Sequence, residues 1–256
     1  MCLIVFAWKQ HDEFPLVLAA NRDEYHARAA APMAWWDDRP SLLAGRDLRA
    51  GGTWLGLSRR GHLAAVTNFR ENVRSVSEQS RGEIVTGYLG SGDSPATWLS
   101  SLNGGAYAGF CALATDGSEL AYRSNRGDET RPLDAGVYGL SNSSLDTPWP
   151  KLLRTRERLS ALLAADALHL DDLLDLMADR EPAEAERSKS AELPFQMPRE
   201  FSAPFIVSPD YGTRCSTAVL CRADGHVEVA ERRFNAEGGT SGESRFVFLS
   251  SAWAES

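Results

Sequence analysis

The sequence predicts an α+β fold in which antiparallel strands precede and follow a group of helices. Two observations lead to this prediction. Short apolar runs are separated by brief turns, which is typical of strands that pair with their neighbours in sequence. Leucines at helical spacing fill the middle of the chain. Because no internal repeat or linker divides the chain cleanly, we expect a single domain over residues 1–256.

The strands are predicted from apolar runs that flank turn residues. Asp116-Gly117 and Asp224-Gly225 are strong hairpin signals, and Gly61 ends a four-residue connection between two further runs. The predicted strand pairs are residues 3–8 with 15–20, 53–57 with 62–67, 107–114 with 119–122, and 215–221 with 226–231. Hairpins of this kind build antiparallel sheets.

Two amphipathic helices are predicted side by side in the sequence, at residues 152–163 and 170–177, because their leucines recur on one helical face. Weaker helical patterns cover residues 80–89 and 94–102, and Ser94 is a suitable N-cap for the latter. Trp35 and Trp36 could line the mouth of a pocket, but they are interpreted as part of a covering loop that packs on a sheet. The glycine-rich residues 238–242 are interpreted as a flexible surface loop.

Composition excludes several classes of function. The chain has 27 basic and 35 acidic side chains without a dense basic run, so we do not expect a nucleic-acid partner. No apolar stretch reaches the roughly 18 residues of a membrane span, and the start has no signal-peptide pattern, so we expect a cytoplasmic protein. The 4 cysteines and 5 histidines are too scattered to predict a disulfide framework or a metal site.

Cys2 is the residue whose position suggests chemistry. It follows the initiator Met1 and opens the first predicted strand. Removal of Met1 is favoured by a small second residue and would leave a thiol and a free α-amine on Cys2. An α-amine with a pKa of about 7.7 to 8.0 can accept the thiol proton near neutral pH, and a thiolate is a strong nucleophile. The alternative is that Cys2 is simply a small buried side chain.

Asn21-Arg22-Asp23-Glu24 follows the second predicted strand and would lie beside the start of the first. Alternation along a strand places Asn21 and Asp23 on one face and Arg22 and Glu24 on the other. A charged quartet of this kind is more often a solvated strand end. Following a Cys2 start, however, the quartet resembles the NRDE family, also called the transport and Golgi organisation protein 2 family.

Further blocks of that family pattern follow in order across most of the chain, and their combination is far more specific than any single block. The blocks are Gly45-Arg46-Asp47, Gly51-Gly52-Thr53-Trp54-Leu55-Gly56, Thr67-Asn68-Phe69-Arg70, Ser80-Arg81-Gly82, Gly139-Leu140-Ser141-Asn142-Ser143 with Trp149 and Lys151, and Tyr211-Gly212-Thr213-Arg214 with Ser216-Thr217.

The family is in turn similar to the N-terminal nucleophile hydrolases, which implies a four-layer αββα sandwich of two antiparallel sheets flanked by helices. Within that superfamily the chain resembles cysteine amidases of the penicillin V acylase and bile salt hydrolase type. The resemblance implies that Cys2 is the nucleophile and that Asp23 orients its α-amine. It also implies that Asn68 and Asn142 are amide donors to an oxyanion and that Arg214 is a later cation of the site.

Other residues of the motifs have supporting roles. In the amidases an arginine immediately precedes the asparagine, whereas Ala20 stands there in this chain and Arg22 follows Asn21. A shift of one residue turns a side chain to the opposite face, so Arg22 does not inherit the amidase role. Thr53 and Trp54 could place backbone near a ligand, and a tight turn with a packed Trp is the alternative.

Two functions from different classes are therefore expected. The first is an N-terminal cysteine hydrolase that cleaves an amide or thioester bond of a small acyl compound and requires no cofactor. The second is a non-catalytic protein of the same fold that binds and transfers haem or acyl-CoA and lipid, because members of the family are associated with haem mobilisation and with lipid or acyl-CoA homeostasis. The expected partner is a small molecule in both cases, an acyl substrate or haem.

Overall fold

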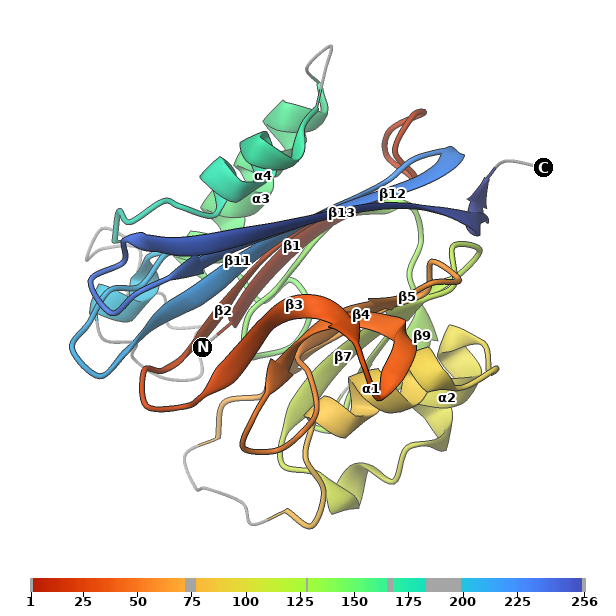
Figure 1. Cartoon of the computed structure of the whole chain (residues 1–256), viewed down its shortest axis with the longest axis horizontal. Helices are drawn as coiled ribbons and strands as arrows, with labels where there is room; N and C mark the ends of the chain where they lie inside the picture. Colours follow the sequence, from red (N-terminus) through yellow and green to blue (C-terminus); the bar gives the residue numbers. More distant parts are fainter. Residues whose placement is uncertain (1, 72–76, 128, 165–167, 183–198, 255–256) are drawn as a thin grey trace.

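The computed structural model describes residues 2–71, 77–127, 129–164, 168–182 and 199–254. Two antiparallel β-sheets pack face to face, and helices cover both outer faces, so that four layers lie on top of one another (Figure 1). The predicted αββα sandwich is therefore confirmed. Within the described ranges, no helix has the length and apolar character needed to cross a bilayer.

One sheet has six strands in the order β10-β1-β2-β11-β12-β13. The strands are β1 Cys2–Trp8, β2 Leu16–Tyr25, β10 Gly136–Leu140, β11 Tyr211–Cys221, β12 Asp224–Phe234 and β13 Thr240–Ala254. Two of the predicted hairpins, β1 with β2 and β11 with β12, are confirmed. Because β2 also pairs with β11, the last part of the chain lies directly beside the first.

The other sheet has seven strands, each paired with its neighbours in sequence. The strands are β3 Ala30–Trp36, β4 Arg39–Asp47, β5 Leu55–Ser58, β6 Leu63–Asn68, β7 Phe110–Thr115, β8 Leu120–Ser124 and β9 Arg131–Pro132. The two predicted hairpins of this region, β5 with β6 and β7 with β8, are confirmed.

The four predicted helices are also confirmed, with ends that differ by a few residues. They are α1 Gly82–Gly90, α2 Pro95–Ser101, α3 Pro150–Leu163 and α4 Leu170–Leu176, with short 3-10 turns at Gly104–Ala106 and Arg199–Ser202. Ser94 caps α2 as predicted, since its Oγ accepts a hydrogen bond from the backbone N–H of Thr97 at 3.3 Å. Helices α1 and α2 cover the seven-stranded sheet, and α3 and α4 cover the six-stranded one (Figure 1).

Strand β1 is buried on both faces, which explains its uninterrupted apolar sequence. Its even-numbered residues from Ile4 to Trp8 pack between the two sheets. Its odd-numbered residues from Leu3 to Ala7 pack beneath α3 and α4. The same alternation points the side chain of Cys2 into the space between the sheets.

Two local interpretations of the sequence are wrong. Trp35 and Trp36 belong to β3 and not to a covering loop, and the indole N–H of Trp36 donates to the carbonyl of Ala44 at 2.9 Å. The pairing of β3 with β4 is interrupted by two register shifts, so the sequence lacks the alternation that would reveal a strand.

The glycine-rich residues 238–242 are only partly a loop, because β13 already begins at Thr240. This strand forms the edge of the six-stranded sheet, and the side chains on one of its faces are exposed. An edge strand with a solvated face tolerates a polar sequence, which is why its first half does not read as a strand.

Gly52 lets the loop after β4 pack against the first turn of α1. A Cβ at position 52 would lie 2.7 Å from the backbone carbonyl carbon of Gly82. Backbone atoms cannot move aside as the end of a side chain can, so we predict that Gly52→Ala lowers the free energy of unfolding by about 1–3 kcal/mol. Gly90→Ala is the matched control, because a Cβ there meets no atom within 4 Å. Urea unfolding followed by circular dichroism measures both, and equal stability of the two variants would contradict this packing.

Candidate active site

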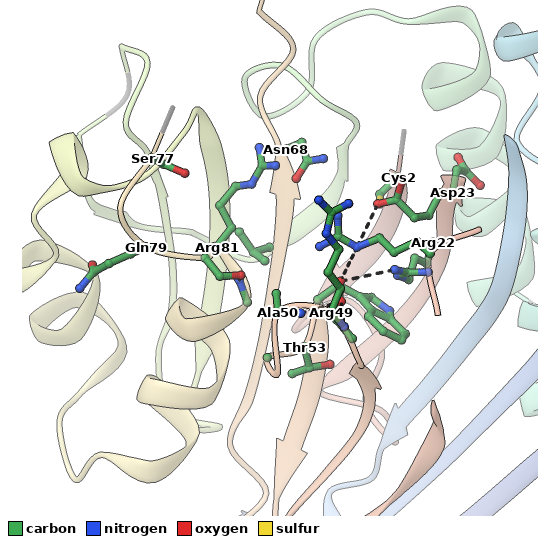
Figure 2. A pocket seen from close by; sticks show the side chains of 18 of the residues that line it. Cys2, Arg22, Asp23, Arg49, Ala50, Thr53, Asn68, Ser77, Gln79 and Arg81 are labelled. Carbon is green, nitrogen blue, oxygen red and sulfur yellow. Dashed lines mark hydrogen bonds and ion pairs between the residues drawn. The ribbon is translucent and has the colours of Figure 1, made fainter. Parts of the chain in front are cut away.

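The N-terminal end of β1 opens into a pocket of about 440 Å³ between the two sheets. Strands β1 and β2 form one wall, while the ends of β4 and β6 and the first turn of α1 form the other (Figure 2). The charged residues of the lining are Arg22, Arg28, Arg49, Arg81, Asp23, Glu24, Asp47 and Glu78. Positive and negative side chains are thus equal in number, and the lining is mostly polar.

Cys2 is the one cysteine of the chain that is not fully buried, and it lines the pocket. Its partner across the strand pair is Arg22. Burial raises the pKa of the Cys2 thiol, while a hydrogen bond from the backbone N–H of Asp23 and the charge of Arg22 favour the thiolate. The site therefore holds a thiol that is accessible to a ligand but needs a base to be ionised near neutral pH.

Asn142 connects Cys2 to the opposite sheet. Its Oδ1 accepts a hydrogen bond from the backbone nitrogen of Cys2 at 3.0 Å, and its Nδ2 donates to the carbonyl of Asn68 at 2.8 Å. These two partners fix which end of the amide faces Cys2, since a backbone N–H requires an acceptor. Both ends of Asn142 are engaged, so in this arrangement the side chain positions the Cys2 nitrogen and does not point a donor into the pocket.

Asn68, at the end of β6, has an exposed side chain that lines the pocket. Within the described part of the chain its amide has no hydrogen-bond partner, and it therefore remains available to a ligand. Figure 2 shows Asn68 and Arg81 across the pocket from Cys2 and Arg22.

Asp23 lies on the face of β2 opposite to Arg22 and is 4% exposed. Its Oδ1 accepts a hydrogen bond of 2.7 Å from the hydroxyl of Thr213, its partner across the strand pair. Burial raises the pKa of the Asp23 carboxyl, and the positive charges of Lys151 and Arg22 and the Thr213 hydrogen bond act in the opposite direction.

Arg22 is held between an aromatic ring and a carboxylate. Its guanidinium carbon lies 4.5 Å from the centre of the Trp54 ring, and Nη2 lies 3.8 Å from Asp47 Oδ2. Burial disfavours the charge of Asp47, but hydrogen bonds from Arg28 and from backbone N–H groups outweigh it and lower the pKa of this carboxyl. Glu24 completes the cluster, with a carboxylate oxygen 3.8 Å from Arg28 Nε.

Three other predicted residues lie apart from the reactive part of the pocket. Asn21 Nδ2 donates to the carbonyls of Met177 and Pro204 at 2.8 and 3.0 Å, beneath the helices. Arg214 lies at a bulge of β11, and its Nη1 donates to the carbonyls of Tyr25, His26 and Arg28. Thr53 lines the pocket, but its hydroxyl donates to the carbonyl of Leu55 at 3.0 Å. These contacts hold the wall of the site together.

Two residues of the site were not assigned a role from sequence. Arg81, just before α1, lines the pocket, donates to the carbonyl of Gly109 at 3.0 Å and forms no ion pair within the described residues. Lys151, in the first turn of α3, is 1% exposed. Both stand in the sequence blocks quoted above, and this was the only signal available, because neither has a spacing that indicates chemistry.

The chain is similar in sequence to proteins of one family. The family model described as Transport and Golgi organisation 2 matches residues 1–236. The Transport and Golgi organization protein 2 homolog of Homo sapiens is 36% identical over 255 residues, which cover 91% of this chain and 92% of that protein. The Drosophila melanogaster Transport and Golgi organization protein 2 is 27% identical over 189 residues, 64% of this chain and 66% of that protein.

Among solved structures, the C2A mutant of the conjugated bile acid hydrolase from Clostridium perfringens matches with a TM-score of 0.51 and 9% sequence identity. The match covers 100% of this chain and 98% of that one. At this identity the similarity is one of fold, and it agrees with the N-terminal nucleophile hydrolase fold expected from the sequence.

The exposure of the four thiols predicts their reactivity. We expect iodoacetamide to alkylate Cys2 of the folded protein about tenfold faster, or more, than the buried Cys111, Cys215 and Cys221. Peptide mapping by mass spectrometry measures the four rates. Faster labelling of any buried thiol in the folded state would contradict the placement of Cys2.

The charge of Arg22 predicts how that rate depends on pH. Burial raises the pKa of Cys2 and Arg22 lowers it, so Arg22→Met should raise it further. Because the thiolate is the reactive form, alkylation of the variant should be about three- to tenfold slower near pH 7, and the difference should vanish above the thiol pKa. Arg22→Lys, which keeps the charge, is the control. A rate at pH 7 that is unchanged by Arg22→Met would refute this electrostatic role.

Proposed function

The chain belongs to the Transport and Golgi organisation 2 family and has the fold of the N-terminal nucleophile hydrolases, and on this basis we propose that it is an N-terminal cysteine hydrolase. Its substrate is an amide or a thioester of a small acyl compound. The proposal depends above all on the surroundings of Cys2, a partly exposed thiol in a pocket, with its backbone nitrogen 3.0 Å from Asn142 Oδ1. Once Met1 is removed, that nitrogen becomes an α-amine held beside the thiol.

In the first step, the α-amine takes the proton of the Cys2 thiol and the sulfur attacks the carbonyl carbon of the substrate. The electron pair of the carbonyl bond moves to its oxygen. We assign this oxyanion to Asn68 Nδ2 and the guanidinium of Arg81, two of the donors on the opposite wall. A fixed donor of this kind is worth about 2.7–4 kcal/mol of transition-state stabilisation.

In the second step, the oxyanion collapses and the carbon–nitrogen or carbon–sulfur bond breaks. The leaving group takes the proton held by the α-ammonium, and the acyl group remains on Cys2 as a thioester. The neutral α-amine then activates a water molecule, which attacks the thioester and releases the carboxylic acid and the free thiol. One water is consumed and no redox cofactor is required.

Asn142 has a different role in this mechanism from the one expected from sequence. With its Oδ1 on the Cys2 nitrogen and its Nδ2 on a carbonyl, it aims the α-amine and leaves the oxyanion to Asn68. We assign the carboxylate of Asp23 to the orientation of the same amine, the role that the family resemblance implies for it. Arg214 supports the loop after β2 from its bulge and contacts no reacting group.

The lining of the pocket favours hydrolysis of a small polar substrate over the binding alternative. Trp54 and Val66 are its large apolar members, which is little surface for a long acyl chain. Within the described lining, Cys2 is the only side chain of the Cys, His and Met types that commonly ligate haem. Stoichiometric binding of haem or acyl-CoA without turnover would favour the carrier function.

The decisive test combines the mass of the purified protein with its activity. We expect the intact mass to correspond to a chain that starts at Cys2. Screening N-acyl amides and small thioesters should then give an activity that Cys2→Ala lowers by about a thousandfold or more, since Cys2 is the only thiol in the described lining of the pocket.

Cys221→Ala is the matched control, because it removes a buried thiol of the same sheet at a distance from the pocket. It should retain most of the activity when thermal unfolding shows that it is folded. Retention of Met1 in an active protein, or full activity of Cys2→Ala, would refute the proposal.

A further inference from the structure

Lys151 is a buried cation to which the proposed mechanism gives no role. It is the second residue of α3 and is 1% exposed, on the face of the helix that packs on the six-stranded sheet. Within the described residues, its Nζ has no hydrogen-bond partner. Burying an ammonium group is costly unless an opposite charge lies near it. A lysine in this place therefore needs a physical explanation.

The ionisable groups around Lys151 indicate which charge its ammonium compensates. Helix α3 packs on β1, β10 and α4. The ionisable groups that act on the Lys151 ammonium are Asp23 from β2, Cys2 from β1 and Arg70 after β6. Burial lowers the pKa of Lys151, whereas Asp23 and Cys2 favour its charged form.

The other charged or ionisable side chains of these neighbouring elements point elsewhere. Asp171 and Asp175 of α4 pair with Arg232 on β12. Asp172 accepts a hydrogen bond from the backbone N–H of His169 at 2.8 Å. Tyr138 of β10 packs between the two sheets. Among the described residues, Asp23 is therefore the carboxylate whose charge favours the ammonium form of Lys151.

Asp23 creates a difficulty for the proposed chemistry. The family resemblance implies that the Asp23 carboxylate orients the α-amine of Cys2. A carboxylate in that position favours the charged ammonium, but the base must be neutral to take the thiol proton. A cation whose charge acts on Asp23 would reduce this conflict. Lys151 belongs to the buried face of α3, which packs on the six-stranded sheet, and the alternation of β2 turns Asp23 to the helix-covered face of that sheet, together with Val17 and Ala19.

We propose that Lys151 is a positioning residue whose ammonium offsets the negative charge of Asp23, so that Asp23 orients the α-amine of Cys2 without holding a proton on it. The inference rests on the proposed function. Lys151 does not line the pocket, so it acts through Asp23 and not on the substrate. Loss of the Lys151 charge should therefore raise the pKa of the α-amine, and the amine then becomes neutral only at higher pH.

The test is the pH dependence of p-nitrophenyl acetate hydrolysis by the full-length protein, corrected for the rate of Cys2→Ala. In Lys151→Met the acid limb of the kcat/KM profile should move to higher pH by about one unit. At pH values below the pKa of the α-amine, kcat/KM should therefore be about tenfold lower than in the wild type, and at pH values above that pKa it should be nearly equal to it. Lys151→Arg keeps the charge and should restore the wild-type limb. The rate of Cys2 alkylation by iodoacetamide should follow the same shift without any substrate.

Thr155→Val is the matched control, since Thr155 is a neutral buried residue one turn further along the same face of α3. Its acid limb should stay at the wild-type pH. Lys151→Gln repeats the test with a polar side chain if the Met variant does not fold. An acid limb that does not move in a folded neutral variant, or an equal loss at every pH, would overturn the inference.

Failure of the inference can be separated from failure of the proposed function. If Cys2→Ala abolishes hydrolysis but the limb of the neutral variants is unchanged, the function stands and the role of Lys151 is wrong. If Cys2→Ala is as active as wild type, the function itself is wrong.

Discussion

The structure of the site depends on one side-chain amide that joins the two sheets. Asn142 follows β10 of one sheet, and Asn68, whose carbonyl it binds, ends β6 of the other. Its backbone φ of 53° is left-handed, a conformation that Asn adopts more readily than most residues. This backbone turns the amide between the Cys2 nitrogen and the opposite sheet. The start of β1, the mouth of the pocket and the exposed amide of Asn68 are therefore fixed relative to one another.

Successive side chains of β2 lie on opposite faces of the sheet, so the charged groups of the motif are distributed between two layers of the structure. Arg22 points into the pocket, where it contacts Trp54 and Asp47, while Asp23 lies on the face of β2 that α3 and α4 cover, where Lys151 lowers the pKa of its carboxyl. Asn21, on the same face as Asp23, is anchored to two carbonyls and accepts a hydrogen bond of 2.6 Å from Ser216. Within this motif of four consecutive polar residues, Arg22 is a cation near the thiol, Asp23 is a carboxylate on the other face of the strand, and the hydrogen bonds of Asn21 fix the strand that carries both.

Sequence patterns predicted the hairpins and helices, and the family resemblance implied the four-layer sandwich, but together they predicted only part of the site. The hairpins and helices follow from local periodicity, and Cys2 and the Asn21–Glu24 quartet stand next to each other because β1 and β2 form a hairpin. Strand β3 was missed because its pairing is irregular, and the polar start of β13 because one face is solvated. The orientation of the Asn142 amide, the exposed donors of Asn68 and Arg81 and the burial of Lys151 depend on contacts between distant segments, which periodicity does not encode.

The most direct test of the central claim is to trap the intermediate. An acid quench during turnover of an activated acyl substrate protonates the α-amine of Cys2, which keeps the acyl group on sulfur and prevents its transfer to nitrogen. Mass spectrometry of the quenched protein should then show one acyl group, and mapping should place it on the N-terminal peptide as a thioester that hydroxylamine removes. Turnover with no adduct on that peptide under conditions where acylation is faster than deacylation, or an adduct on another residue, would contradict the account.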